Sequence, residues 1–294
     1  MIDFTSTPIS ALAESGAVTW AGMQTYVTVM IALVAVMTVL DLIHKGSATY
    51  FFNASKKAEA DLKQGLADGN SNCTIGTNEG RFKALTGGDK MGALINTVVV
   101  DVATSGEFHN PVRRLVHLLT MYGFILFNAS TAMIIYGGGE SAALATAWNL
   151  GAIMLFVGSF WFWFVFKVDV RAEGNTWTNI VIRRDMFSLS LMATSLTALG
   201  WTMTGGGTGV WFALVILSTA SLFGGVYWSK FSHMFFKPAA AYNKRIIKLD
   251  GTNENLPHET RDSEWQQNRH SMELLKNAPM DMGLGIKREE PTHY

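Results

Sequence analysis

The chain has 294 residues, of which 49% are hydrophobic and only 16% charged, and its 23 basic residues balance its 23 acidic ones. Zero net charge gives no electrostatic support to a nucleic-acid function, and the single cysteine, Cys73, excludes an internal disulfide and an iron–sulfur cluster built by this chain alone. A soluble domain of this length usually carries about a quarter charged residues. Because the deficit is concentrated in blocks, it favours membrane spans over a large soluble core.

The first 20 residues are predicted to form an external N-terminus. No Lys or Arg occurs in residues 1–16, and a secretory signal peptide needs a basic beginning, so we expect no cleavage and a retained first transmembrane helix over 21–43. A cytoplasmic loop with interfacial helices is expected over 44–110. Within it, residues 51–63 have the pattern of an amphipathic interfacial helix, and the apolar run Met91–Val102 is expected to lie along the membrane surface.

Five apolar stretches are long enough to cross a bilayer, because each has about 18 to 23 residues where ~20 are needed. They are Ala21–Ile43, Leu115–Tyr136, Trp148–Phe166, Met186–Met203 and Val210–Trp228. We expect the fifth helix to continue inward to His233 and to end before Pro238. Residues 111–237 then form a four-helix membrane region, and residues 238–294 form a polar cytoplasmic tail.

Charge asymmetry predicts the orientation of this bundle. All 23 Lys and Arg residues fall in three segments on one side, and the N-terminus and the connections 137–147 and 205–209 have none. Segments rich in Lys and Arg stay in the cytoplasm. The predicted fold is therefore an all-α integral membrane protein with a bundle of five transmembrane helices, its N-terminus outside and its C-terminus cytoplasmic, in the cytoplasmic membrane.

Two histidines, His117 and His233, are predicted to lie near the cytoplasmic ends of the second and fifth spans. His117 follows Pro111 by six residues, which is ~9 Å along a helix. Imidazole is rare in lipid, and two facing neutral imidazoles are the axial ligands that the iron of a b-type haem requires. The pair therefore predicts a haem iron site. In the alternative interpretation, both histidines hydrogen-bond neighbouring helices or a quinone.

A stripe of small residues accompanies His233 on the fifth span. Ser218, Ser221, Gly225 and Ser229 lie near the same side of that helix and would leave room for a flat macrocycle. Small residues also serve ordinary helix packing in membranes, and by base rate this second interpretation is favoured for the stripe alone.

Basic residues surround the cytoplasmic ends of the spans. Arg113, Arg114 and Lys230 are predicted to neutralise haem propionates, with Arg114 the first choice because it stands one helical turn from His117. Further basic residues on this side are Arg183, Arg184 and Lys237. The alternative is that these residues only fix the topology and anchor lipid headgroups.

His44 and His109 are further candidates, either for a second haem or for contact with a quinone headgroup. The simpler alternative for each is a solvated histidine at the membrane interface. No histidine lies in the outer half of any expected span, so the chain offers haem ligands at one depth only. The span interiors also lack charged residues, which disfavours a proton pump or an ion transporter.

Two motifs resemble a known group of membrane subunits. They are the segment from Gly106 to Phe124, GEFHNPVRRLVHLLTMYGF, and the segment from Trp228 to Pro238, WSKFSHMFFKP. With five spans they resemble the nitrate reductase gamma-chain-like group, which includes the membrane subunits of heterodisulfide reductase and of the quinone-interacting Qmo complex. A short chain without cluster motifs looks most like the membrane anchor of dissimilatory adenylylsulfate reductase.

The resemblance implies an electron-transfer function in a respiratory chain and in sulfur metabolism. In that group, the helices bind b haems and exchange electrons between a quinone pool and a cytoplasmic flavin or iron–sulfur subunit. By resemblance, His117 and His233 match the ligands of the haem nearest the cytoplasm. Phe127 stands where a ligand of a second haem would be expected, so one haem b is predicted.

Three hypotheses follow for the function. The first is a non-catalytic membrane subunit of an oxidoreductase complex that carries one haem b and links quinone to a cytoplasmic flavin/iron–sulfur reductase. The second is a haem-free anchor that docks the same reductase to the bilayer. The third is a transporter, which the lack of charged residues and broken helices in the spans disfavours.

Overall fold

The computed structural model describes residues 4–45, 84–106, 111–166, 180–229 and 233–251, together with the single positions 53, 56, 57, 60, 64 and 178. These residues form helices joined by turns, and the described ranges contain no strand, so the predicted all-α class is confirmed for them. The chain divides into two compact units. Unit 1 comprises Met1–Ile43 and Phe108–His233, and unit 2 comprises His44–Glu107 and Met234–Tyr294.

Three helices within the described residues are long and apolar enough to cross a membrane. They are α2 (Trp20–Lys45), α5 (Pro111–Gly137) and α6 (Ala142–Trp161), and α6 continues as the π-helical segment η2 (Phe162–Phe166). A helix of 25 residues extends for ~38 Å, which exceeds the ~30 Å hydrocarbon thickness of a bilayer. The chain therefore has the helices of a membrane protein.

Two further helices occupy the positions of the fourth and fifth expected spans, but neither of them is both long enough and apolar enough to be a candidate span. The first, α8 (Ile182–Met203), is long enough at 22 residues, but its several Ser and Thr side chains dilute its apolar character. The second, α9 (Val210–Gly224), is strongly apolar but has only 15 residues, which is ~22 Å along its axis. The described residues therefore support three candidate spans, which α8 and α9 accompany.

The predicted course of the fifth helix is wrong beyond Gly224. The helix ends there, residues 225–228 form turns, and a separate helix, α10 (His233–Leu249), begins at His233 and includes Pro238. Gly225 accounts for the end, because glycine is the poorest helix former after proline, and its amide closes the last turn on the Ser221 carbonyl at 3.0 Å. Pro238 removes one helical hydrogen bond but does not end α10.

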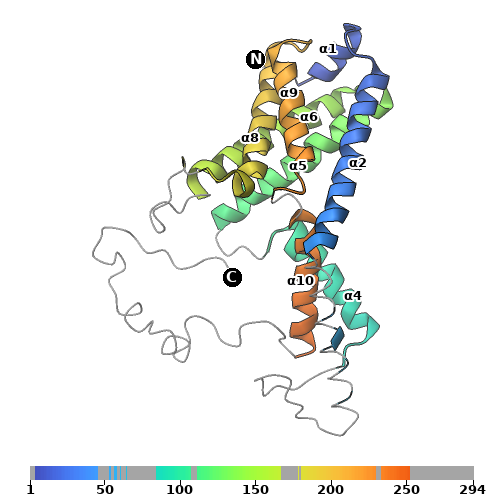
Figure 1. Cartoon of the computed structure of the whole chain (residues 1–294), viewed down its shortest axis with the longest axis vertical. Helices are drawn as coiled ribbons and strands as arrows, with labels where there is room; N and C mark the ends of the chain where they lie inside the picture. The colour runs from blue at the N-terminus through green and yellow to red at the C-terminus, as the bar shows by residue number, and fades with distance from the viewer. Residues whose placement is uncertain are drawn as a thin grey trace, which may run out of the picture. The chain divides into compact units, whose positions relative to one another are not determined.

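Glycines allow α5 and α6 to approach until their backbones touch. A Cβ atom built on Gly123 would lie 2.5 Å from the amide nitrogen of Leu155, and one built on Gly151 would lie 2.6 Å from that of Phe127. Figure 1 shows the two helices side by side as a hairpin. Small residues at such contacts are the usual means of helix association in lipid, where dispersion contacts replace the hydrophobic effect.

A short helix that the sequence analysis did not predict, α1 (Pro8–Glu14), lies before the first span. Thr7 caps this helix, and Pro8 occupies its first turn. Both residue types are favourable at these positions of a helix start. Glu140, in the connection between α5 and α6, accepts hydrogen bonds from the Thr7 amide at 3.1 Å and from the Thr7 hydroxyl at 2.5 Å. These bonds, with the buried side chains of Ile9 and Leu12, fix α1 against the connection between α5 and α6.

Unit 2 is built from α4 (Gly87–Asn96), the π-helical segment η1 (Thr97–Ala103) and α10. A reciprocal capping box between Thr86 and Asp89 begins α4. The guanidinium of Arg245 on α10 donates two hydrogen bonds to the carboxylate of Asp101 on η1, at 2.6 and 2.7 Å. This charged pair links η1 to α10 within unit 2.

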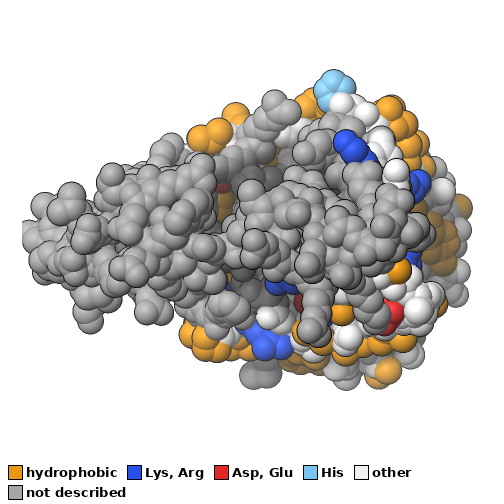
Figure 2. Space-filling model, turned by 90° about the horizontal axis from the view of Figure 1, so that it is seen from below, with side chains coloured by type: hydrophobic (Ala, Val, Ile, Leu, Met, Phe, Trp, Pro, Cys, Tyr) orange, Lys and Arg blue, Asp and Glu red, His pale blue; other side chains and the backbone are white. Residues whose placement is uncertain are grey.

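The apolar run Met91–Val102 is helical, and much of it is exposed. Met91, Leu94, Ile95 and Val98 follow one side of the helix at spacings of three and four residues, and all four are exposed. Figure 2 shows one face of the molecule, on which described hydrophobic side chains lie mainly around the rim with Lys and Arg side chains among them. Most of the amphipathic helix expected over 51–63 lies outside the described residues.

Candidate functional site

The first two turns of α5 carry three of the predicted site residues, Arg113, Arg114 and His117. The helix begins at Pro111, as its sequence predicts. Arg113 is half-buried, its guanidinium donates a hydrogen bond to the carbonyl oxygen of Phe166 at 3.4 Å, and it lies 5.7 Å from the centre of that phenyl ring. Arg113 therefore holds the end of η2 against α5, a structural role that the sequence analysis did not foresee.

The imidazole of His117 is exposed on the surface of the described residues, whereas its neighbour Val116 is buried. Arg114 precedes it by three residues and therefore lies on the same side of the helix. An exposed imidazole can be reached by a cofactor, a quinone or a partner chain that covers this side of α5. The donor set, one imidazole with a guanidinium one turn away, fits an iron ligand beside a propionate partner.

The other predicted site residues are described in part or not at all. His233 begins α10, but its side chain lies outside the described residues, as do Lys230, His109 and the side chains of Arg183 and Arg184. His44 is exposed near the end of α2, and Lys237 is exposed on α10. The pairing of His117 with His233 thus stays a prediction, with one correction: His233 belongs to a new helix and not to the continued fifth span.

A groove that sequence analysis had not located lies between α8 and α9, the neighbouring helices in Figure 1. Its volume is about 400 Å³, which is within the usual range for pockets that hold small molecules. Apolar side chains and four hydroxyl side chains form its walls. The lining residues are Ile182, Met186, Leu189, Ser190, Ala193, Thr197, Leu214, Leu217, Ser218 and Ser221.

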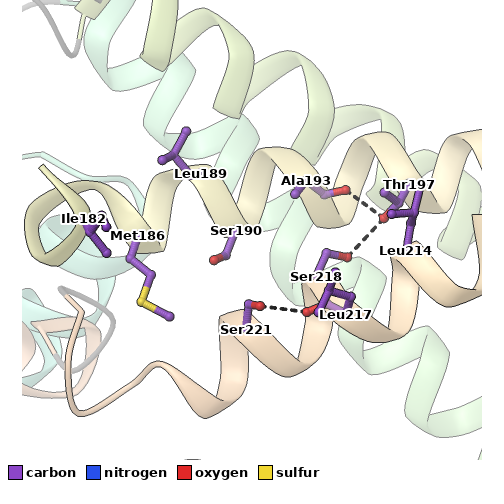
Figure 3. Close-up of a pocket in the computed structure, with 10 residues that line it drawn as sticks. All are labelled: Ile182, Met186, Leu189, Ser190, Ala193, Thr197, Leu214, Leu217, Ser218 and Ser221. Carbon is purple, nitrogen blue, oxygen red and sulfur yellow. Dashed lines mark hydrogen bonds between the residues drawn. The ribbon is translucent and has the colours of Figure 1, made fainter. Parts of the chain in front are cut away.

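Figure 3 shows how the groove is closed at one end and open at the other. The hydroxyls of Thr197 and Ser218 are hydrogen-bonded to each other at 3.1 Å, and this contact joins the two helices. Toward the beginning of α8 the helices diverge, and the side chains of Met186 and Ser190 point into the space between them. Ile182, at the open end, is 75% exposed, and Leu217, beside Ser218 at the other end, is 64% exposed, so the groove opens to the surroundings of unit 1.

The hydroxyls in the groove differ in their hydrogen bonds. Thr197 donates to the Ala193 carbonyl at 2.7 Å, and Ser221 donates to the Leu217 carbonyl at 2.8 Å. Ser190 is only 7% exposed and has no hydrogen-bond partner within the described ranges. One turn further along α8, the buried hydroxyl of Thr194 also lacks a partner among these residues.

The predicted stripe of small residues on the fifth span is partly right. Ser218 and Ser221 do face open space, but the space beside Gly225 is filled, because a Cβ atom there would lie 2.6 Å from the methyl carbon of Met186. The contribution of α8 was missed. Its signal was present in the sequence, because Ser190, Thr194 and Thr197 recur at the spacing of one helix face.

Within the described ranges, no group of three or more His, Cys, Asp or Glu side chains gathers to hold a metal ion. A haem iron needs only two axial side chains from the protein, so this observation does not bear on the predicted pair. Comparison of the chain with protein-family models, with curated proteins and with solved structures found no match in any of the three.

Proposed function

We propose that the chain is an integral membrane subunit that holds one haem b between His117 and His233. It exchanges electrons between the quinone pool and a cytoplasmic flavin/iron–sulfur reductase such as adenylylsulfate reductase. In this proposal the subunit itself is non-catalytic. Five helices cross the cytoplasmic membrane, with α8 and α9 as the fourth and fifth spans, the N-terminus outside and the C-terminus in the cytoplasm.

The observation that carries the proposal is the placement of His117 and Arg114 in the second turn of α5. This helix is long and apolar enough to span a bilayer, and Pro111 begins it as its motif predicts. His117 therefore lies ~9 Å from the start of a membrane helix. The concentration of all Lys and Arg residues in three segments supports a cytoplasmic position for that end of the helix.

The residues of the chain would have three tasks toward the haem. His117 and His233 would supply imidazole nitrogens to the iron, and Arg114 would compensate the charge of a propionate. The surrounding helices exclude water and fix the position of the group between quinone and reductase. When bound, the haem supplies one-electron redox chemistry at a potential that these surroundings tune.

The test is the haem content of the purified full-length protein and of two variants. His117→Ala should lose the low-spin b-type spectrum in reduced-minus-oxidised difference measurements, because it removes an axial ligand. His44→Ala, which changes an exposed histidine at the end of α2, should keep the full spectrum and serves as the control. A complete spectrum in His117→Ala, or its loss in His44→Ala, would show that the ligands are assigned wrongly.

A haem-free anchor is the second candidate, because the His117 imidazole is exposed and not buried within the described residues. In that case the imidazole contacts the docked reductase or a quinone directly. A pyridine haemochrome assay on the wild-type protein separates the two candidates. Absence of haem from protein purified from its native membrane would favour the anchor.

A further inference from the structure

We propose that the groove between α8 and α9 binds the ring of a lipid-soluble quinone, with the Ser190 hydroxyl donating a hydrogen bond to a ring carbonyl. The inference rests on the proposed function, to which it adds the site of the quinone. Two observations carry it, namely an apolar groove of about 400 Å³ and a largely buried serine whose hydroxyl oxygen is accessible and makes no hydrogen bond within the described residues.

The hydroxyl identifies the polar part of the ligand. A serine in a membrane helix ordinarily bonds the carbonyl four residues before it, as Ser221 does with Leu217. Ser190 makes no such bond within the described ranges and points into the groove in Figure 3. Because the hydroxyl oxygen is accessible, a carbonyl oxygen on a ligand in the groove can accept a hydrogen bond from it.

The walls identify the remainder of the ligand. Met186, Ala193, Leu214 and Leu217 are apolar, and none of the lining residues is charged. A phospholipid headgroup or another ion would lose its hydration there without a compensating charge. An acyl chain would fit the walls but offers no acceptor to Ser190, whereas a quinone ring offers both a flat apolar body and carbonyl oxygens.

The mouth of the groove identifies the route of entry. Ile182 is strongly exposed at the mouth, and in the proposed topology it faces the hydrocarbon of the bilayer. Ser190 is eight residues from the start of α8, which is ~12 Å along its axis. A quinone could therefore enter sideways from the lipid and leave its isoprenoid tail outside.

The experiment measures quinone binding to the full-length protein in nanodiscs made from quinone-free lipid. Decylubiquinone and menadione are titrated separately, and the dissociation constant is taken from quenching of tryptophan fluorescence for whichever binds the wild type more tightly. Ser190→Ala should raise this constant about three- to tenfold, the usual effect of one lost hydrogen bond. Ser221→Leu should raise it more than about tenfold, because the larger side chain fills part of the groove.

A matched control is Ser130→Ala on α5. Ser130 is buried like Ser190, but its hydroxyl donates to the Leu126 carbonyl at 2.7 Å and it does not line the groove. The control should leave the dissociation constant within about twofold of the wild type. If Ser190→Ala and Ser221→Leu also bind like the wild type, the quinone binds elsewhere and the inference is wrong.

Haem content, measured on the same samples, separates this inference from the proposed function. Protein that lacks haem but shows the expected order of quinone affinities would support the groove and contradict the haem site. Protein that contains haem but binds quinone equally well in every variant would contradict the groove alone. If Ser221→Leu loses haem and keeps its quinone affinity, the groove holds the macrocycle and the inference is overturned.

Discussion

The contacts inside unit 1 differ in kind from the contacts inside unit 2. In unit 1, helices meet through glycines, and hydroxyl side chains mostly bond the backbone of their own helix, as Thr131 does with Phe127 at 2.7 Å. In unit 2, the contact between η1 and α10 includes the charged pair of Arg245 and Asp101. Most hydroxyls of unit 1 thus form local hydrogen bonds, although Glu140 and Arg113 also join distant segments, while unit 2 adds an ion pair that water or lipid headgroups can solvate.

The exposed apolar surface differs in the same way. On α2, exposed apolar side chains occur along the length of the helix, from Val29 to Ile43. In unit 2 they follow one side of α4, from Met91 to Ile95, and continue in η1 at the consecutive residues 98–100, and the exposed lysines of α10, Lys237, Lys244 and Lys248, share one helix face. The first pattern suits a helix surrounded by hydrocarbon, and the second suits a segment at an interface between lipid and water.

The largest expected effect is on the glycine contact of unit 1. Gly151→Leu would force the side chain into the backbone of α5 at Phe127, and overpacking of this kind costs about 3 kcal/mol or more. We expect a Tm lower by roughly 5–10 °C in detergent, or failure to accumulate in the membrane. Differential scanning fluorimetry on the purified protein measures the change.

A second glycine provides the control for that substitution. A Cβ atom on Gly137, at the end of α5, would have no atom within 4 Å. Gly137→Leu should therefore change the Tm by less than about 2 °C, which corresponds to a surface substitution. Equal losses in the two variants would mean that leucine itself, and not the close contact, destabilises the protein.

A smaller effect is expected from Glu140, which lies in the connection between α5 and α6. Glu140→Ala removes the acceptor of two hydrogen bonds from Thr7, and hydrogen bonds to charged groups contribute about 1.5–3 kcal/mol. Faster hydrogen exchange of the α1 amides should report the release of that helix. Glu14→Ala, which changes an exposed acid on α1, should leave the exchange unchanged, and an equal effect of both would contradict this role of Glu140.

The smallest effect is expected from the charged pair of unit 2. The hydrogen bonds to Asp101 raise the pKa of the Arg245 guanidinium above its ordinary value, so the group stays charged at neutral and moderately alkaline pH. Arg245→Met should destabilise the contact by only about 0.5–1 kcal/mol, because both side chains are partly exposed to solvent.

Hydrogen exchange of the η1 amides provides the measurement for Arg245→Met. Lys244→Met is the control, because Lys244 is the exposed neighbour of Arg245 on the same helix. If both substitutions speed the exchange equally, the bidentate geometry contributes nothing beyond the positive charge. If neither does, apolar packing alone holds unit 2 together.

The positions of the membrane helices follow from the sequence, and their ends follow less well. Hydropathy places α2 and α5 within a few residues, because a long apolar run has few other stable forms in lipid. It missed the start of α6, where Ser141 caps the helix seven residues before the expected beginning at Trp148. It also missed the end of α9, where Gly225 outweighs the apolar residues that follow it.

The candidate site was likewise predictable from the sequence only in part. A local rule places His117 in the second turn of α5, because a proline and a following apolar run define a helix start. The groove could not be predicted from one helix, because it depends on how far α8 and α9 diverge beyond the contact of Thr197 with Ser218. The bond between Arg113 and Phe166 likewise depends on two segments that are distant in the sequence.

The short length of α9 determines which bilayer thickness would suit it as a span. A helix of ~22 Å in a hydrocarbon layer of ~30 Å creates a hydrophobic mismatch. In the proposed topology, the turn after Gly224 completes the crossing, and non-helical backbone at that depth is stable only where protein covers it. Gly225, Val226 and Ser229 are buried, while Trp228 is exposed, so protein covers most of this turn. A fifth span of this kind would partition into the thinner regions of a bilayer and would lose its fit as the lipid chains lengthen.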